Sequence, residues 1–79
     1  MNIEKLIKDT EYELKKAEHN LESAIQDIEN GIEFIRTYPG SADKSSLSLG
    51  AEAVFVHSSK VYTLKCLLKR LYAEQEAAV

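Results

Sequence analysis

Residues 7–35 read IKDTEYELKKAEHNLESAIQDIENGIEFI, and this stretch decides the fold. A large apolar residue recurs there at every seventh position: Ile7, Leu14, Leu21, Ile28 and Ile35. A small residue follows each of the first four by three positions: Thr10, Ala17, Ala24 and Gly31. A seven-residue apolar repeat is typical of a long α-helix that keeps one seam against a partner helix. The small residues predict that the two backbones approach each other closely.

The second half of the chain carries the same repeat. Its seam row is Leu47, Val54, Val61 and Leu68, with Gln75 at the next turn, and a companion row holds Gly50, His57, Leu64 and Leu71. Folding the chain back at Ser41 pairs Ile35 with Leu47, Ile28 with Val54, Leu21 with Val61, Leu14 with Leu68 and Ile7 with Gln75. The same fold places Glu18 beside Lys65. The two repeats therefore predict an all-α fold, an antiparallel two-helix hairpin that resembles a coiled coil.

Tyr38-Pro39-Gly40-Ser41 separates the two repeats. Proline disfavours helix at the residue before it, and glycine supplies the backbone freedom of a tight connection. We expect one domain over residues 1–79, with a helix over about 3–37 capped by Asn2, a loop over about 38–45 and a helix over about 46–76. Ser41, with Asp43 in the first turn, is the expected cap of the second helix. A start at Ser45, Ser46 or Ser48 is the alternative, since serine-rich segments compete with helix.

The chain has 79 residues, which is near the lower size at which one core is self-sufficient. Its lone cysteine, Cys66, cannot form an intramolecular disulfide, and no Cys/His set has metal-site spacing. We therefore expect no metal and no cofactor, and oligomerisation remains as the supplement. The single cysteine and the missing signal peptide indicate a cytoplasmic protein. No apolar run approaches the roughly 20 residues that a membrane span needs, so no span is predicted. A net charge of −3 argues against binding of duplex nucleic acid.

Several large apolar residues lie beside the two seams, where a pair of helices has no third layer to bury them. We expect them to form an oligomer interface, and the set is Ile25, Ile32, Phe34, Phe55, Val56, Tyr62 and Leu67. A two-fold dimer that forms a four-helix bundle is the simplest solution. The prediction is a protein that is at least dimeric at micromolar concentration.

Catalytic chemistry finds little support in the sequence. His57 and Ser58 are adjacent on a predicted helix, so their side chains diverge by about 100° and cannot act as base and nucleophile. We expect His57 to be partly buried and bonded to a nearby hydroxyl or to a second copy, and a polar pocket at the bundle centre is the alternative. Cys66 is expected in the core, with a reactive thiol as the alternative. The chain has no Gly-rich phosphate loop, no H-E-x-x-H motif and no calcium loop, so we predict that it is not an enzyme.

Two groups of side chains are candidates for binding. Between Ala53 and Ala73 there is no acidic residue, while four basic residues fall there: Lys60, Lys65, Lys69 and Arg70. This basic stripe either faces the acidic first helix or forms a surface for an acidic partner. The second group, near the loop, is Arg36, Tyr38, Lys44, Ser45 and Ser46. A helix N-terminus favours anions, and Tyr38 can stack on a base while the two cations hold phosphates.

Tyr38-Pro39 with Lys44 downstream, set between two helices, resembles phage-encoded proteins that sequester the cyclic nucleotides of bacterial immunity. The resemblance covers a handful of residues and serves as an analogy. It implies a small nucleotide bound at the loop between subunits.

The function predicted first is that of a small, non-catalytic helical protein. It forms oligomers and binds another macromolecule as an adaptor, inhibitor or assembly factor. Phe55, Tyr62 and the basic stripe are the expected contact residues. The alternative is a small-ligand binder that uses the Tyr38–Lys44 loop region.

Overall fold

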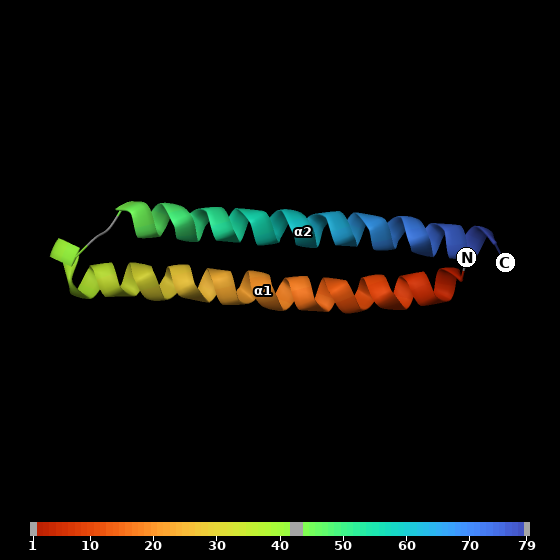
Figure 1. The fold of residues 1–79 in the computed structure, drawn as a ribbon, viewed down its shortest axis with the longest axis horizontal. Coiled ribbons are helices and arrows are strands. Elements are labelled where there is room, and N and C mark those ends of the chain that lie inside the picture. The colour runs from red at the N-terminus through yellow and green to blue at the C-terminus, as the bar shows by residue number, and fades with distance from the viewer. Residues whose placement is uncertain (1, 42–43, 79) are drawn as a thin grey trace.

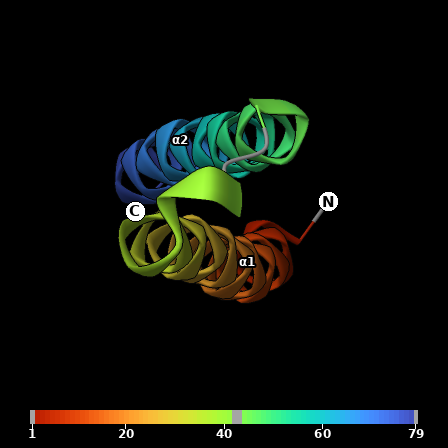
Figure 2. The same cartoon turned by 90° about the vertical axis from the view of Figure 1, so that its left-hand side faces the viewer.

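The structure is a computed structural model that describes residues 2–41 and 44–78, with the side chains of residues 41–46 outside the description. It consists of two α-helices, α1 (Ile3–Thr37) and α2 (Lys44–Ala77), with the short 3₁₀ turn η1 (Pro39–Ser41) after α1. The helices lie side by side and antiparallel, so the two termini meet at one end of a particle of 61 × 15 × 14 Å (Figure 1). Viewed along the long axis, the two helices lie against each other with η1 in front of them (Figure 2). The predicted helical hairpin is confirmed.

The ends of α1 follow the capping signals in the sequence. The Asn2 side-chain oxygen accepts a hydrogen bond from the Lys5 backbone N–H at 3.3 Å, as predicted. At the other end the Tyr38 backbone N–H donates to the Phe34 carbonyl at 2.8 Å, just before Pro39 stops the helix. Helix α2 begins at Lys44, slightly before the predicted residue 46. Ser41 lies in η1 and not at the start of α2, so its predicted role as the cap is wrong, and Asp43 lies outside the described residues.

The buried core lies in the half of the hairpin near the termini. Its fully buried residues are Ile7, Thr10, Ala17, Val61, Leu68 and Leu71. Ile7, Leu68 and Leu71 form one cluster, and Leu14 packs against it. The Thr10 hydroxyl donates to the Leu6 carbonyl at 2.7 Å, so this buried polar group is satisfied within its own helix.

The observed register agrees with the predicted one at two contacts in the half of the hairpin near the termini. The Lys65 ammonium lies 4.0 Å from the Glu18 carboxylate, and Leu14 packs against the cluster that contains Leu68, both as predicted. Ile7 differs, because it joins Leu68 and Leu71 and was expected opposite Gln75. In a coiled coil a seam residue inserts between side chains of successive turns, so the companion row supplies part of each contact.

Of the two glycines within the helices, Gly50 lies against the other helix and Gly31 does not. A Cβ atom at Gly50 would lie 3.1 Å from Cγ1 of Ile28, whereas a Cβ atom at Gly31 would meet nothing within 4 Å beyond its own helix. The predicted close approach at Gly31 is therefore wrong. The missing side chain on α2 makes room for a large residue of α1.

Candidate functional site

The side of α2 that faces away from α1 carries a group of exposed apolar side chains. Phe55 is 72% exposed, Tyr62 71%, Leu49 68% and Val56 55%. Phe55 and Tyr62 follow a seam-row residue by one position, and Leu49 and Val56 follow one by two positions. They therefore lie about 100° and about 160° from the seam row, since each residue advances the helix by about 100°. We call this surface the outer face of α2. Its middle row is Glu52, Ser59, Cys66 and Ala73. One side row is Phe55, Tyr62 and Lys69, and the other is Leu49, Val56, Thr63 and Arg70.

Cys66 belongs to this outer face and is exposed. The expectation of a buried core cysteine is wrong. Leu64, Leu67 and Leu68 surround it in the sequence, but of these only Leu68 is fully buried, and Cys66 lies on the opposite side of the helix. Sequence neighbours were therefore a poor guide, and the seven-residue spacing from Ser59 to Ala73 indicates its true position.

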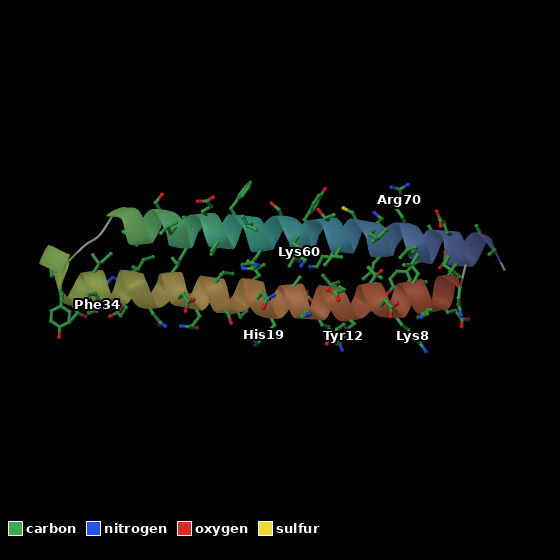
Figure 3. All side chains as sticks on the ribbon, viewed as in Figure 1. Lys8, Tyr12, His19, Phe34, Lys60 and Arg70 are labelled. Carbon is green, nitrogen blue, oxygen red and sulfur yellow. The ribbon has the colours of Figure 1, made fainter. Side chains whose placement is uncertain are left out.

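The outer side of α1 has the opposite character. Lys8, Tyr12 and His19 point away from α2 on that side (Figure 3). Arg70 points away from α1 at the other side of the molecule in the same view. Lysines, glutamates and other polar residues fill the outer rows of α1, with Tyr12 as the one aromatic residue there. The two outer sides of the hairpin are thus distinct, one polar and one largely apolar.

The expected interface residues lie on three different surfaces. Ile25 and Ile32 continue the row of Glu11 and Glu18, which contact Tyr72 and Lys65, so they lie on that flank of the hairpin. Phe34 and Leu67 lie on the opposite flank, and Phe55, Val56 and Tyr62 on the outer face of α2. Ile25 is half-buried, and the other six residues are exposed. The hairpin therefore leaves these side chains uncovered, but it does not gather them on one face.

The basic stripe divides in the same way. Lys65 pairs with Glu18 across the two helices, at a flank where the two side chains are 60% and 48% exposed. Lys60, Lys69 and Arg70 are exposed, and no carboxylate in the described part of the chain lies within 4.0 Å of their charged groups. The expectation that the stripe faces the acidic first helix thus applies to Lys65, and the other three cations face solvent.

A groove of about 420 Å³ opens on the flank opposite Lys65, in the middle of the hairpin. Three small residues leave the space: Ala24, Gly50 and Ala53. Four polar side chains surround it: Asn20, Ser23, Asp27 and His57. His57 is half-buried and makes no hydrogen bond with the residues that the structure describes, so the expected bond to a nearby hydroxyl is not formed within the chain. Its expected bond to a second copy stays a prediction. The alternative, a polar pocket at the centre of a bundle, also stays a prediction.

The loop group is only partly described. Arg36 donates to the Glu33 carboxylate at 3.1 Å, which neutralises this cation locally. Tyr38 packs against Phe34 with ring centroids 5.1 Å apart and ring planes tilted by 48°. The side chains of Lys44, Ser45 and Ser46 lie outside the described residues. The described part of this group therefore brings Tyr38 to Phe34 and Arg36 to Glu33.

One polar contact between the helices was missed in the sequence. The Tyr72 hydroxyl donates to the Glu11 carboxylate at 2.7 Å. This hydrogen bond is the main cause that raises the pKa of Tyr72 above its ordinary value of 10.0, with desolvation and the negative charge of Glu11 adding to it. The contact could have been found, because Tyr72 and Glu11 each lie seven residues from the predicted pair of Lys65 and Glu18.

The described residues form neither a membrane-spanning helix nor a metal-binding cluster. Within residues 2–41 and 44–78, neither helix contains a segment apolar enough to cross a membrane. Over the same residues no three histidine, cysteine or acidic side chains converge to hold a metal ion. Comparison with known proteins gives no match to a family model, to a curated protein or to a solved structure.

Proposed function

We propose that this chain is a non-catalytic interaction protein that associates with further copies of itself and binds another macromolecule, as an adaptor, inhibitor or assembly factor. The observation that supports this proposal most strongly is the exposure of Phe55 and Tyr62, at 72% and 71%, on a helix whose other side already forms the seam. A helix that is apolar on two opposite sides has two packing partners. One partner is α1, and the other is absent from the single chain.

The energetic argument follows from the exposed area. Burying one large apolar side chain contributes about 1.5–3 kcal/mol. The outer face of α2 offers four such side chains in contiguous turns: Leu49, Phe55, Val56 and Tyr62. Monomeric proteins rarely leave a patch of this kind in water. Two cations of the same face, Lys69 and Arg70, have no carboxylate within 4.0 Å in the described part of the chain, and they add a preference for an acidic surface.

The self-association part of the proposal is tested by light scattering of the full chain over micromolar concentrations. We expect a mass at least twice the 8.9 kDa of one chain. A mass of one chain, with the helical circular dichroism signal intact, would refute self-association.

The partner-binding part is tested by quantitative affinity capture from the native host. The probe pair is the full chain and a Tyr62→Asp variant, because Tyr62 is 71% exposed on the outer face of α2 and has no role in the buried core. We expect a protein that the native chain enriches and the variant loses. Equal enrichment by both chains, or none by either, would contradict binding through this face.

The alternative, a nucleotide binder at the loop, has less support. Arg36 is paired with Glu33, and Tyr38 packs on Phe34, so neither is arranged around a shared space. A thermal-shift screen with nucleotides tests this alternative, since a ligand that binds only the folded state raises the melting temperature.

A further inference from the structure

The outer face of α2 has two unlike ends. The end nearer the loop holds the large apolar residues Leu49, Phe55 and Val56, and one acid, Glu52, lies among them. The end nearer the C-terminus holds small residues in its middle row, Cys66 and Ala73, with cations beside them. One end of this face thus has large side chains and a negative charge, and the other end has small side chains and positive charges. Two copies of the face are complementary when their α2 helices run antiparallel.

We propose that a second copy of this chain docks on the outer face of α2 with its own α2 antiparallel, about a two-fold axis that crosses the helix beside Val61. This assignment rests on the proposed self-association and names the surface and register that carry it. The resulting assembly is a layer of four helices in the order α1, α2, partner α2, partner α1.

The register follows from the residues that face each other across this axis. In the antiparallel arrangement each middle-row residue lies opposite side-row residues of the second copy. Cys66 then faces Phe55 and Val56, Ser59 faces Tyr62 and Thr63, and Ala73 faces Leu49. Every large side chain thus meets a small one, which lets the two helices approach closely.

The charges support the same register. Glu52 of one copy faces Lys69 and Arg70 of the other, and the symmetry forms this contact twice. Within the described chain, none of these three residues has an oppositely charged group within 4.0 Å. All three are exposed, and Arg70 points away from α1 (Figure 3). Charged groups that have no oppositely charged neighbour in one chain gain such a neighbour from the second copy.

Two other arrangements fit the residues less well. A parallel pairing of the two α2 helices brings Glu52 against its own copy, where like charges repel. An antiparallel pairing shifted by one heptad, with the axis beside His57, places Glu52 opposite Tyr62 and Thr63 and leaves Lys69 and Arg70 without a carboxylate. The axis beside Val61 also uses the full length of residues 49–73, roughly 36 Å of helix.

The test is a charge exchange measured as the dimer dissociation constant of the full chain, by sedimentation equilibrium. We expect Glu52→Arg to weaken the dimer at least about tenfold, because it places like charges together. The double variant Lys69→Glu/Arg70→Glu weakens it similarly. Combining all three changes restores the dissociation constant to within about threefold of the native value, since opposite charges again face each other.

Two matched controls separate the register from general effects of charge. Glu29→Arg makes the same change on the polar outer side of α1, and Lys60→Glu reverses a cation on the flank of α2, outside the proposed interface. Neither should weaken the native dimer. Circular dichroism of every variant establishes that the helices remain folded.

Each outcome decides one part of the proposal. A native chain that is monomeric throughout refutes the proposed self-association and this inference together. A native dimer that the exchanges leave unchanged, or that the triple variant fails to restore, overturns the inference alone. Rescue of Glu52→Arg by Lys60→Glu, in place of the Lys69 and Arg70 changes, overturns the register.

Cys66 gives an independent measurement. Its thiol is exposed in the single hairpin and faces Phe55 and Val56 of the second copy in the proposed dimer. Alkylation of Cys66 should therefore slow as the concentration of the native chain rises through the dissociation constant. The rate in Glu52→Arg should stay at the fast value over the same range, and a rate independent of concentration in the native dimer would contradict the proposal.

Discussion

The two halves of the hairpin differ in how well they are packed, although the same seven-residue repeat runs through both. Near the termini, Ile7, Ala17 and Leu68 are no more than 6% exposed. Near the loop, Ile28 and Val54 of the same rows are only half-buried, and Leu47 is 37% exposed. The position of an apolar residue in a repeat therefore does not determine its burial.

The companion rows explain the difference. In the half near the termini, α2 supplies Leu64 and Leu71 beside the seam, while the corresponding positions near the loop are Gly50 and His57. On α1 the small row ends in Ala24 and Gly31. Less side-chain volume near the loop leaves the groove beside His57 and exposes the seam residues to water. This half of the hairpin is the half that gains most from a partner.

The largest expected effect is a core truncation in each half. Leu68→Ala should lower the free energy of unfolding by about 2–4 kcal/mol, because it removes a fully buried side chain from the Ile7 cluster. Leu47→Ala, the matched change near the loop, should cost less than about 1 kcal/mol. Urea denaturation at one fixed protein concentration measures both, since association shifts apparent stability. Equal losses would show that the halves do not differ.

Adding volume gives the converse comparison. Ala17 is 1% exposed, so Ala17→Leu should destabilise the chain by about 1–3 kcal/mol through overpacking. Ala24→Leu makes the same change seven residues along, where the groove of about 420 Å³ can accept it. Its effect on the free energy of unfolding should be near zero or stabilising. A larger loss at Ala24 than at Ala17 would contradict the packing difference.

A smaller effect distinguishes the two helical glycines. Gly31→Ala should stabilise the chain by up to about 1 kcal/mol, because the added methyl group meets nothing and alanine favours helix. Gly50→Ala should gain less or destabilise, since Ile28 must move from a distance of 3.1 Å. The difference in thermal midpoint between the two variants is the measurement. A more stable Gly50→Ala would place the close approach elsewhere.

The smallest expected effect is a pH dependence in the half near the termini. The raised pKa of Tyr72 means that its protonated form is favoured in the folded chain, so its stabilising contribution is complete below pH 10 and is lost as the pH rises above that value. Tyr72→Phe should therefore be slightly less stable than the native chain at pH 7. The gap should close above pH 10 in paired denaturation curves, and a gap that widens there would give the opposite sign.

Much of the fold was predictable from sequence, because apolar periodicity and helix-breaking residues are local signals. The repeat from Ile7 to Ile35, the break at Pro39 and the pairing of Glu18 with Lys65 all predicted structure that is confirmed. Features that depend on volume were not predictable in this way. The exposure of Cys66 and the close contact at Gly50 depend on which side chains fill the space between the helices. The residues next to them in the sequence do not indicate which side chains these are.

The candidate surfaces were predicted less well than the fold for a related reason. Large apolar residues beside the seam were correctly expected to be uncovered, but the list combined two flanks and one outer face. Assigning each residue to its own row separates these surfaces. That assignment also shows that Glu52 shares a face with Lys69 and Arg70, which a search for charge runs does not reveal.

The central claim is that a second copy covers the outer face of α2, whose end near the loop is packed least firmly within the single hairpin. Hydrogen–deuterium exchange along the full chain, at concentrations below and above dimerisation, tests this most directly. We predict that amides near Ile7 to Ala17 and Val61 to Leu71 are protected at both concentrations, while those at 47–57 gain protection only at the higher one. Protection at 47–57 that equals the rest of the chain and does not change with concentration would contradict the claim.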